Sequence, residues 1–378
     1  MKKLAAVLMI FAIFVIMPAT VLADSEADNE AYDRLVSEIN DGLSFEGDDE
    51  VQQILDENNI SVDKPSAVAD IKAENILNSG YEMFIEALKK PLVMLGKIIA
   101  VAMLCVLVGS LSPEGGLDKT FSIVCVLATV LVLSDTVTDS FYLVQSSIER
   151  LNSFMASYIP IFSSVAAAGG NISSSGGYYG IMLLICEGAA VIAGNVLIPF
   201  LSAVLAVTIV SAVNPNLQFS SVAESVKKAV IWLLGIVMTL FVGLLSIQSF
   251  AGSAADNLSS RALKFAASSF IPVIGGSISE AYSAVKGSLG VIRTSVGVVG
   301  IIILVIIVAK PIITVIAVKL AVWLGKIIND VLGNRECSEL LKNINAVLSI
   351  GLSIIIAYSV VFVIATSVIM LTAMNLGA

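Results

Sequence analysis

Histidine is absent from this 378-residue chain, and charged residues make up only 13% of it. Without histidine the chain lacks the usual proton shuttle near neutral pH and the commonest metal ligand in proteins. It therefore contains no H-E-x-x-H zinc motif and no Ser-His arrangement for acyl transfer. The G-x-x-x-x-G-K-[ST] phosphate loop is also missing, which excludes nucleotide hydrolysis by that route. We expect no enzymatic activity, no catalytic or metal-binding residue and no cofactor.

Cysteine is almost as scarce as histidine, since only four occur: Cys105, Cys125, Cys186 and Cys337. Three of them lie in apolar segments and none lies in the acidic segment near the N-terminus, so we expect no disulfide framework. Basic residues do not gather into the clustered face that nucleic-acid binding requires, and we expect no nucleic-acid partner.

Apolar residues dominate the sequence, with 57% hydrophobic residues and a mean hydropathy of +0.96. Such a chain has too few polar groups to cover a water-soluble globule. Four uncharged stretches are each long enough for the roughly 20 residues of a spanning helix: 151–186, 188–223, 229–255 and 343–378. Helices satisfy their own backbone groups in lipid. The sequence therefore predicts an all-α polytopic membrane protein in the lipid bilayer.

The N-terminal region is predicted to leave the cytoplasm. In residues 1–23, Lys2 and Lys3 precede an apolar run and small residues, which is typical of a cleaved signal peptide; an uncleaved anchor is the alternative. From Asp24 to Leu88 there are 18 acidic residues and three basic ones. Acidic residues do not hold a segment inside, so we assign residues 24–90 to a small extracytoplasmic helical segment. Residues 91–149 should form a transmembrane helix pair.

A short motif occurs twice in the remainder of the chain. Ser-Tyr-Ile-Pro-Ile at 157–161 returns as Ser-Phe-Ile-Pro-Val at 269–273. Pro160 and Pro272 are 272 − 160 = 112 residues apart, and Pro199 and Pro311 have the same separation. We infer a tandem repeat, with copies at 150–250 and 251–378, of the kind found in transporter and channel scaffolds. Chance similarity between apolar sequences is the alternative.

The four prolines are expected to be structural bends. Pro160 and Pro272 lie in Ser- and Gly-rich segments that resemble interfacial or re-entrant helices. Pro199 and Pro311 interrupt apolar tracts that exceed one membrane thickness, which predicts a broken helix or a tight pair of helices in each. The two copies would have the same orientation if each tract crosses the membrane once, and opposite orientations if each crosses twice.

Three charged residues lie inside apolar tracts and form a candidate intramembrane polar path: Glu187, Lys310 and Lys319. A charge at the bilayer centre costs at least a few kcal/mol unless it is paired or hydrated. A Glu187–Lys310 pair across the two copies is one interpretation. In the other, the lysines reach an interface and Glu187 caps a short helix.

The stretch from residue 243 to 285, GLLSIQSFAGSAADNLSSRALKFAASSFIPVIGGSISEAYSAV, resembles the stage III sporulation protein AE family of endospore-forming bacteria. The most specific part of the resemblance is Lys264, Phe265, Ile271, Pro272 and Gly275. No match is evident for the acidic residues 24–60.

The resemblance implies a multi-pass protein of the mother-cell membrane that surrounds the forespore. It implies a transport or secretion channel joining the two cells, with ring-forming and other membrane subunits and a secretion-type ATPase as partners. Forespore maturation and late forespore gene expression would depend on it. The alternative is a stand-alone secondary transporter with a polar site between the two repeats.

Overall fold

The computed structural model describes residues 73–111, 118–191, 198–213, 222–270 and 275–374. The predicted signal peptide and most of the acidic segment lie outside these residues, as do Ile271 and Pro272. Those predictions are therefore not tested by the structure.

In the described ranges the chain forms seven α-helices and no strand, which confirms the all-α prediction. The helices are α5 (Ala73–Leu111), α6 (Asp118–Ala168), α7 (Ile172–Val191), α8 (Ile198–Val213), α9 (Val222–Phe270), α10 (Gly275–Val331) and α11 (Arg335–Met374).

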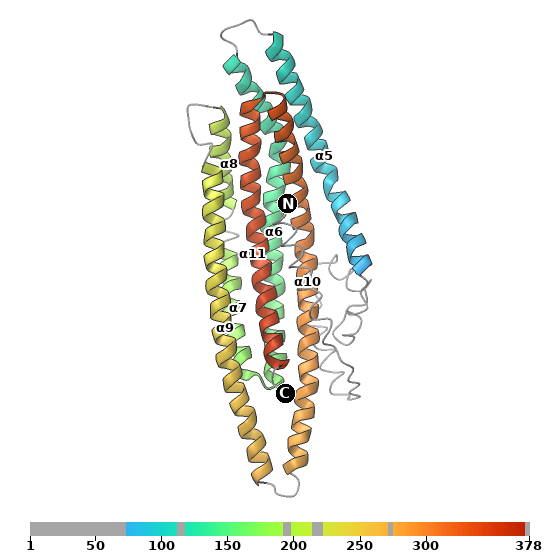
Figure 1. The fold of residues 1–378 in the computed structure, drawn as a ribbon, viewed down its shortest axis with the longest axis vertical. Coiled ribbons are helices and arrows are strands. Elements are labelled where there is room, and N and C mark those ends of the chain that lie inside the picture. Colours follow the sequence, from blue (N-terminus) through green and yellow to red (C-terminus); the bar gives the residue numbers. More distant parts are fainter. Residues whose placement is uncertain (1–72, 112–117, 192–197, 214–221, 271–274, 375–378) are drawn as a thin grey trace.

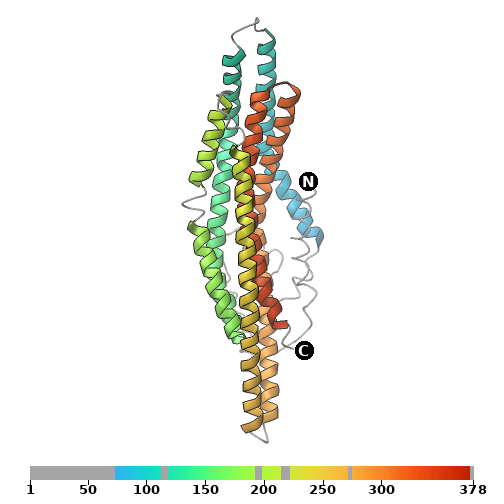
Figure 2. The same cartoon turned by 60° about the vertical axis from the view of Figure 1, so that its left-hand side comes forward.

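The helices pack side by side into a long bundle (Figures 1 and 2). Helices α5 and α6 are antiparallel, α7 and α8 then run in the direction of α5, and α9, α10 and α11 alternate (Figure 1). Helix α11 contacts α6, α7, α8, α9 and α10, so it lies at the centre of the bundle. Helix α9 lies at the edge, because only 11% of its most apolar window is buried, against 61% for α11.

In the part of the chain that the structure describes, five helices are long and apolar enough to cross a membrane: the segments are Met83–Ser110, Phe121–Ala168, Glu224–Ala262, Leu289–Val331 and Arg335–Met370. The first two segments fall on the predicted helix pair, and the shorter apolar helix at Pro199–Ser211 continues the course of α7. The protein is a multi-pass membrane protein.

The two proline-interrupted tracts differ in the structure. In the first tract, α7 ends at Val191 and α8 begins at Ile198, with Pro199 at a helix start, where proline is favoured. In the second tract, α10 continues through Pro311 without interruption, so the predicted broken helix is wrong there. Pro311 is buried among neighbouring helices, and packing in a bundle lets a membrane helix tolerate the hydrogen bond that proline removes.

Pro160 also lies inside a continuous helix, the 51-residue α6. The expectation of a re-entrant helix around Pro160 is therefore wrong, and the segment is the end of a long helix. Because α7–α8 and α10 run in one direction and α9 and α11 in the other, each tract crosses the bundle once (Figure 1). The predicted domain bounds near residues 150 and 250 fall inside the continuous helices α6 and α9. The tandem repeat itself stays a prediction.

Candidate functional site

The charged residues selected from the sequence are not brought together. Glu187 on α7 and Lys310 on α10 are both exposed, and the ion pairs found among the described residues do not include a Glu187–Lys310 pair. Lys319 is half-buried and bonds to α11: its Nζ donates to the Asn345 carbonyl at 3.3 Å, to Asn345 Oδ1 at 3.0 Å and to the Ser349 hydroxyl. Lys319 therefore joins two helices locally.

The family-like motif lies where α9 and α10 extend beyond the other helices as a projecting pair (Figures 1 and 2). Lys264 and Phe265 lie near the end of α9, and Gly275 is the first residue of α10. The Phe265 side chain is 71% exposed. This placement puts Phe265 on an outward surface of the projecting pair.

A buried carboxylate on α9 binds the start of α7. Asp256 Oδ1 accepts a hydrogen bond from the Ser173 N–H at 2.8 Å. Its Oδ2 accepts from the Ser174 N–H at 3.0 Å and from the Ser174 hydroxyl at 2.7 Å. First-turn N–H groups have no partner within their own helix, and the helix N-terminus carries partial positive charge. Asp256, only 3% exposed, therefore caps α7 from a neighbouring helix.

Glycine allows the two helices to come this close. A Cβ at Gly252, one turn before Asp256, would lie 2.8 Å from the Ser174 Cα. Gln248 adds a hydrogen bond from its Nε2 to the Ser173 carbonyl at 3.5 Å. The start of α7 is thus held by a stripe of α9 residues spaced four apart.

An arginine is buried on α10 near this cap. Arg293 is 1% exposed, and its Nη2 donates to the Met370 carbonyl in the last turns of α11 at 3.2 Å. The negative charge of Asp256 acts on Arg293 from a distance, since the ion pairs found among the described residues do not include an Asp256–Arg293 pair. Arg293 Nε and Nη1 are buried and have no hydrogen-bond partner among the described residues.

Two phenols continue this polar region into the bundle. Tyr158 on α6 and Tyr178 on α7 are each 1% exposed, and their hydroxyls are buried in the bundle. Thr366 on α11 lies beside both. The phenol rings are held by aromatic packing: Tyr158 stacks on Phe162, whose ring contacts Tyr178 edge-on, each at 5.4 Å between centroids.

Glycines on α10 make room for this packing. Gly297 and Gly300 lie one and two turns beyond Arg293 on the same helix. A Cβ on Gly297 would lie 2.4 Å from Met370 Sδ, and one on Gly300 would lie 2.2 Å from the Tyr158 ring. We call Arg293, Asp256, Tyr158, Tyr178 and Thr366 the polar layer.

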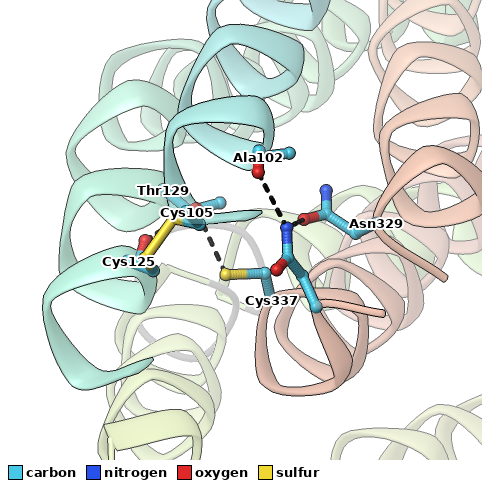
Figure 3. The surroundings of a disulfide bond; sticks show 7 residues. Ala102, Cys105, Cys125, Thr129, Asn329 and Cys337 are labelled. Carbon is cyan, nitrogen blue, oxygen red and sulfur yellow. Dashed lines mark hydrogen bonds between the residues drawn. A yellow bond between two sulfur atoms is a disulfide. The ribbon is translucent and has the colours of Figure 1, made fainter. Parts of the chain in front are cut away.

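The opposite end of the bundle contains a disulfide. Cys105 on α5 and Cys125 on α6 are bonded to each other, a single pairing that was not predicted from the sequence (Figure 3). Cys105 lies about two helical turns before the end of α5, and Cys125 lies about two turns after the start of α6. Because the two helices are antiparallel, these positions place the two side chains at the same level along the bundle.

The same end is joined to α11 by weaker bonds. The Thr129 hydroxyl donates to Cys337 Sγ at 3.6 Å (Figure 3). In the α10–α11 turn, Asn334 Nδ2 donates to the Ala102 carbonyl at 3.1 Å and to Asn329 Oδ1 at 3.3 Å. These contacts hold the neighbouring parts of α5 and α6 against the α10–α11 turn. Within the described ranges, no group of three or more His, Cys, Asp or Glu residues could hold a metal ion.

Counting reactive thiols tests the disulfide. Protein denatured without reductant should take up two maleimide tags, on Cys186 and Cys337, because the other two thiols are bonded to each other. Reduction should raise the number to four. The control Cys105→Ser should take up three tags without reductant, since Cys125 becomes free. Four tags on the unreduced protein would show that the bond does not form.

Sequence reasoning missed both charged members of the polar layer. Neither Arg293 nor Asp256 was singled out in the sequence analysis. The available signal was a lone arginine at the start of an apolar tract, followed by Gly297 and Gly300 on the same helix face.

The sequence model of one protein family, described as stage III sporulation protein AE, matches residues 62–373. The chain belongs to the stage III sporulation protein AE family. This confirms the resemblance drawn from residues 243–285, and it supports a role in sporulation. The acidic residues before position 62 lie outside the match with the stage III sporulation protein AE model.

The chain is similar to stage III sporulation protein AE of Bacillus subtilis (strain 168), with 26% identity over 246 residues. The alignment covers 64% of this chain and 61% of that relative, so the chain spans about three fifths of the relative's length. No solved structure matches the chain.

Proposed function

We propose that the protein is an integral membrane subunit of a sporulation-specific transport or secretion channel complex that links the mother cell and the forespore. The observation that carries the proposal is family membership over most of a chain that folds as a long, multi-pass helical bundle. The bundle would serve as the membrane platform of the complex. It would have no enzymatic activity of its own and would support forespore maturation and late forespore gene expression.

The distribution of basic residues supports an orientation for this subunit. Lys326, Arg335 and Lys342 lie toward the end of the bundle that contains the α10–α11 turn, and the proposed orientation takes these as the cytoplasmic residues; Arg261, Lys264 and Lys286 lie toward the opposite end. Lysine and arginine are retained on the cytoplasmic side. Helix α5 runs toward this end, so the acidic segment before it would be extracytoplasmic, between the mother cell and the forespore. The protein would reside in the mother-cell membrane around the forespore.

The acidic segment and the projecting α9–α10 pair would then face the same side. We propose that they contact ring-forming and other membrane subunits of the complex. A secretion-type ATPase would supply energy, because the chain contains no nucleotide-binding loop.

A clean deletion of the coding sequence in the source bacterium tests this function. The expected result is small, collapsing forespores after engulfment and a silent late forespore reporter, both restored by the wild-type chain. Normal spores with an active reporter would contradict the proposal.

Reconstitution separates a subunit from a stand-alone transporter. The purified protein in liposomes should move no solute by itself, because its partners are missing. Solute uptake by the protein alone would contradict the subunit assignment and favour a secondary transporter.

A further inference from the structure

The polar layer is an unusual feature for the interior of a membrane bundle. It combines a guanidinium, a carboxylate, two phenols and a hydroxyl from five helices, where α7 begins and α11 ends. Two of its buried polar atoms, Arg293 Nε and Arg293 Nη1, have no hydrogen-bond partner among the described residues, and the hydroxyls of Tyr158 and Tyr178 lie beside Thr366. Buried polar groups in proteins are almost always satisfied by protein or by water. Several such groups in one region are the setting in which internal water is found.

The two charges of the layer are not used in the same way. Both carboxylate oxygens of Asp256 accept hydrogen bonds, three in total, at the positive N-terminal end of α7. Arg293 has five N–H donors, and among the described residues its hydrogen bond goes to a single carbonyl, that of Met370. The group with unused hydrogen-bonding capacity is therefore the cation, and the phenols beside Thr366 can also donate.

We propose that the polar layer is a hydrated internal site that takes small anionic or neutral solutes and turns cations away. A fixed arginine excludes cations from other membrane paths by the same electrostatics. This inference rests on the proposed transport function for its physiological meaning. It adds the chemical class of the solute. The two physical claims, that solutes reach the polar layer and that the layer selects them by charge, rest on Arg293 and its neighbours alone.

Reaction of a single introduced cysteine with charged reagents tests the site. In full-length protein with all four native cysteines replaced by serine, Thr366→Cys places a thiol beside both phenols. Two methanethiosulfonates are compared in native membranes, the anionic sulfonatoethyl and the cationic trimethylammonioethyl reagent. In each, the cysteine thiolate attacks the reagent's sulfenyl sulfur, methanesulfinate leaves and a mixed disulfide forms. The matched control is Thr129→Cys, because Thr129 and Thr366 are both 2% exposed and Thr129 lies at the other end of the bundle.

We expect the anionic reagent to modify Cys-substituted position 366 about tenfold faster than the cationic one, since fixed charge alters encounter rates by that order or more. The control position should react with neither reagent until the protein is denatured. Arg293→Gln leaves the charge of Asp256 unopposed and should remove the bias or reverse it in favour of the cationic reagent, whereas Arg293→Lys should preserve the bias. If the glutamine variant does not fold, the comparison of the two reagents in the protein that retains Arg293 still tests the charge selection.

Protection of position 366 from both reagents until denaturation would show a dry core and overturn the inference. Equal rates, or faster reaction with the cationic reagent, would overturn charge selection. These failures differ from failure of the proposed function: a strain that sporulates normally without the chain removes the sporulation role, whatever the labelling rates. Protection of position 366 in a protein that restores sporulation removes only the present inference.

Discussion

Replacing Gly300 with alanine should destabilise the bundle, although alanine favours helix formation over glycine by about 1 kcal/mol. The added Cβ would lie 2.2 Å from the Tyr158 ring. That ring stacks between Phe154 and Phe162 and cannot easily move aside. Overpacking of a core costs about 1–3 kcal/mol, and so close a contact should reach the upper part of that range. The measurement is the free energy of unfolding in detergent with added denaturing surfactant.

Gly287→Ala is the matched control on the same helix. Gly287 is exposed, and a Cβ there would meet no atom within 4 Å. Helix propensity alone should leave this variant unchanged or slightly more stable. If Gly300→Ala is as stable as Gly287→Ala, the close packing of α10 on α6 is not present in solution.

Asp256→Asn should release the start of α7 from α9. The amide offers one acceptor oxygen where the carboxylate provides two, and its NH₂ group would face N–H donors of Ser173 or Ser174. Arg293 would also lose its nearby negative charge. Hydrogen bonds to charged groups contribute about 1.5–3 kcal/mol each. We expect a loss of that order in the free energy of unfolding.

Hydrogen exchange distinguishes this effect from general damage. The amides of Ser173 and Ser174 should exchange faster in Asp256→Asn, while those in the middle of α11 keep their protection. Asp139→Asn is the control, because Asp139 is exposed and pairs with Lys90 at 3.8 Å on the surface. Such surface pairs contribute about 0–1 kcal/mol. Equal stability of the two variants would argue against the cap.

Properties that depend on composition and local order were predictable from the sequence. Low charge content and long apolar stretches predicted an all-α membrane protein, and the described part of the chain confirms it. The stretch from 243 to 285 was sufficient to indicate the family. The reason is that hydropathy adds up residue by residue along a chain, and a family motif is read from neighbouring residues.

The local effect of each proline was not predictable in the same way. Pro199 and Pro311 are equivalent by spacing, yet only the first tract is divided. A proline always removes a backbone hydrogen bond, but the packing around the helix decides whether the helix continues. That packing comes from α5, α6 and α11, which are distant in sequence from Pro311.

The candidate site shows the same division between local and tertiary information. By itself the sequence determined the class of protein, its family and the presence of rare charges in apolar tracts. Only the tertiary structure decided that Glu187 and Lys310 face outward, that Cys105 meets Cys125, and that Asp256 and Arg293 share the interior. The rotation of each helix about its axis determines whether a charge faces the bundle or its surroundings. That rotation is set by close contacts such as Gly300 with Tyr158, between residues that lie far apart in the chain.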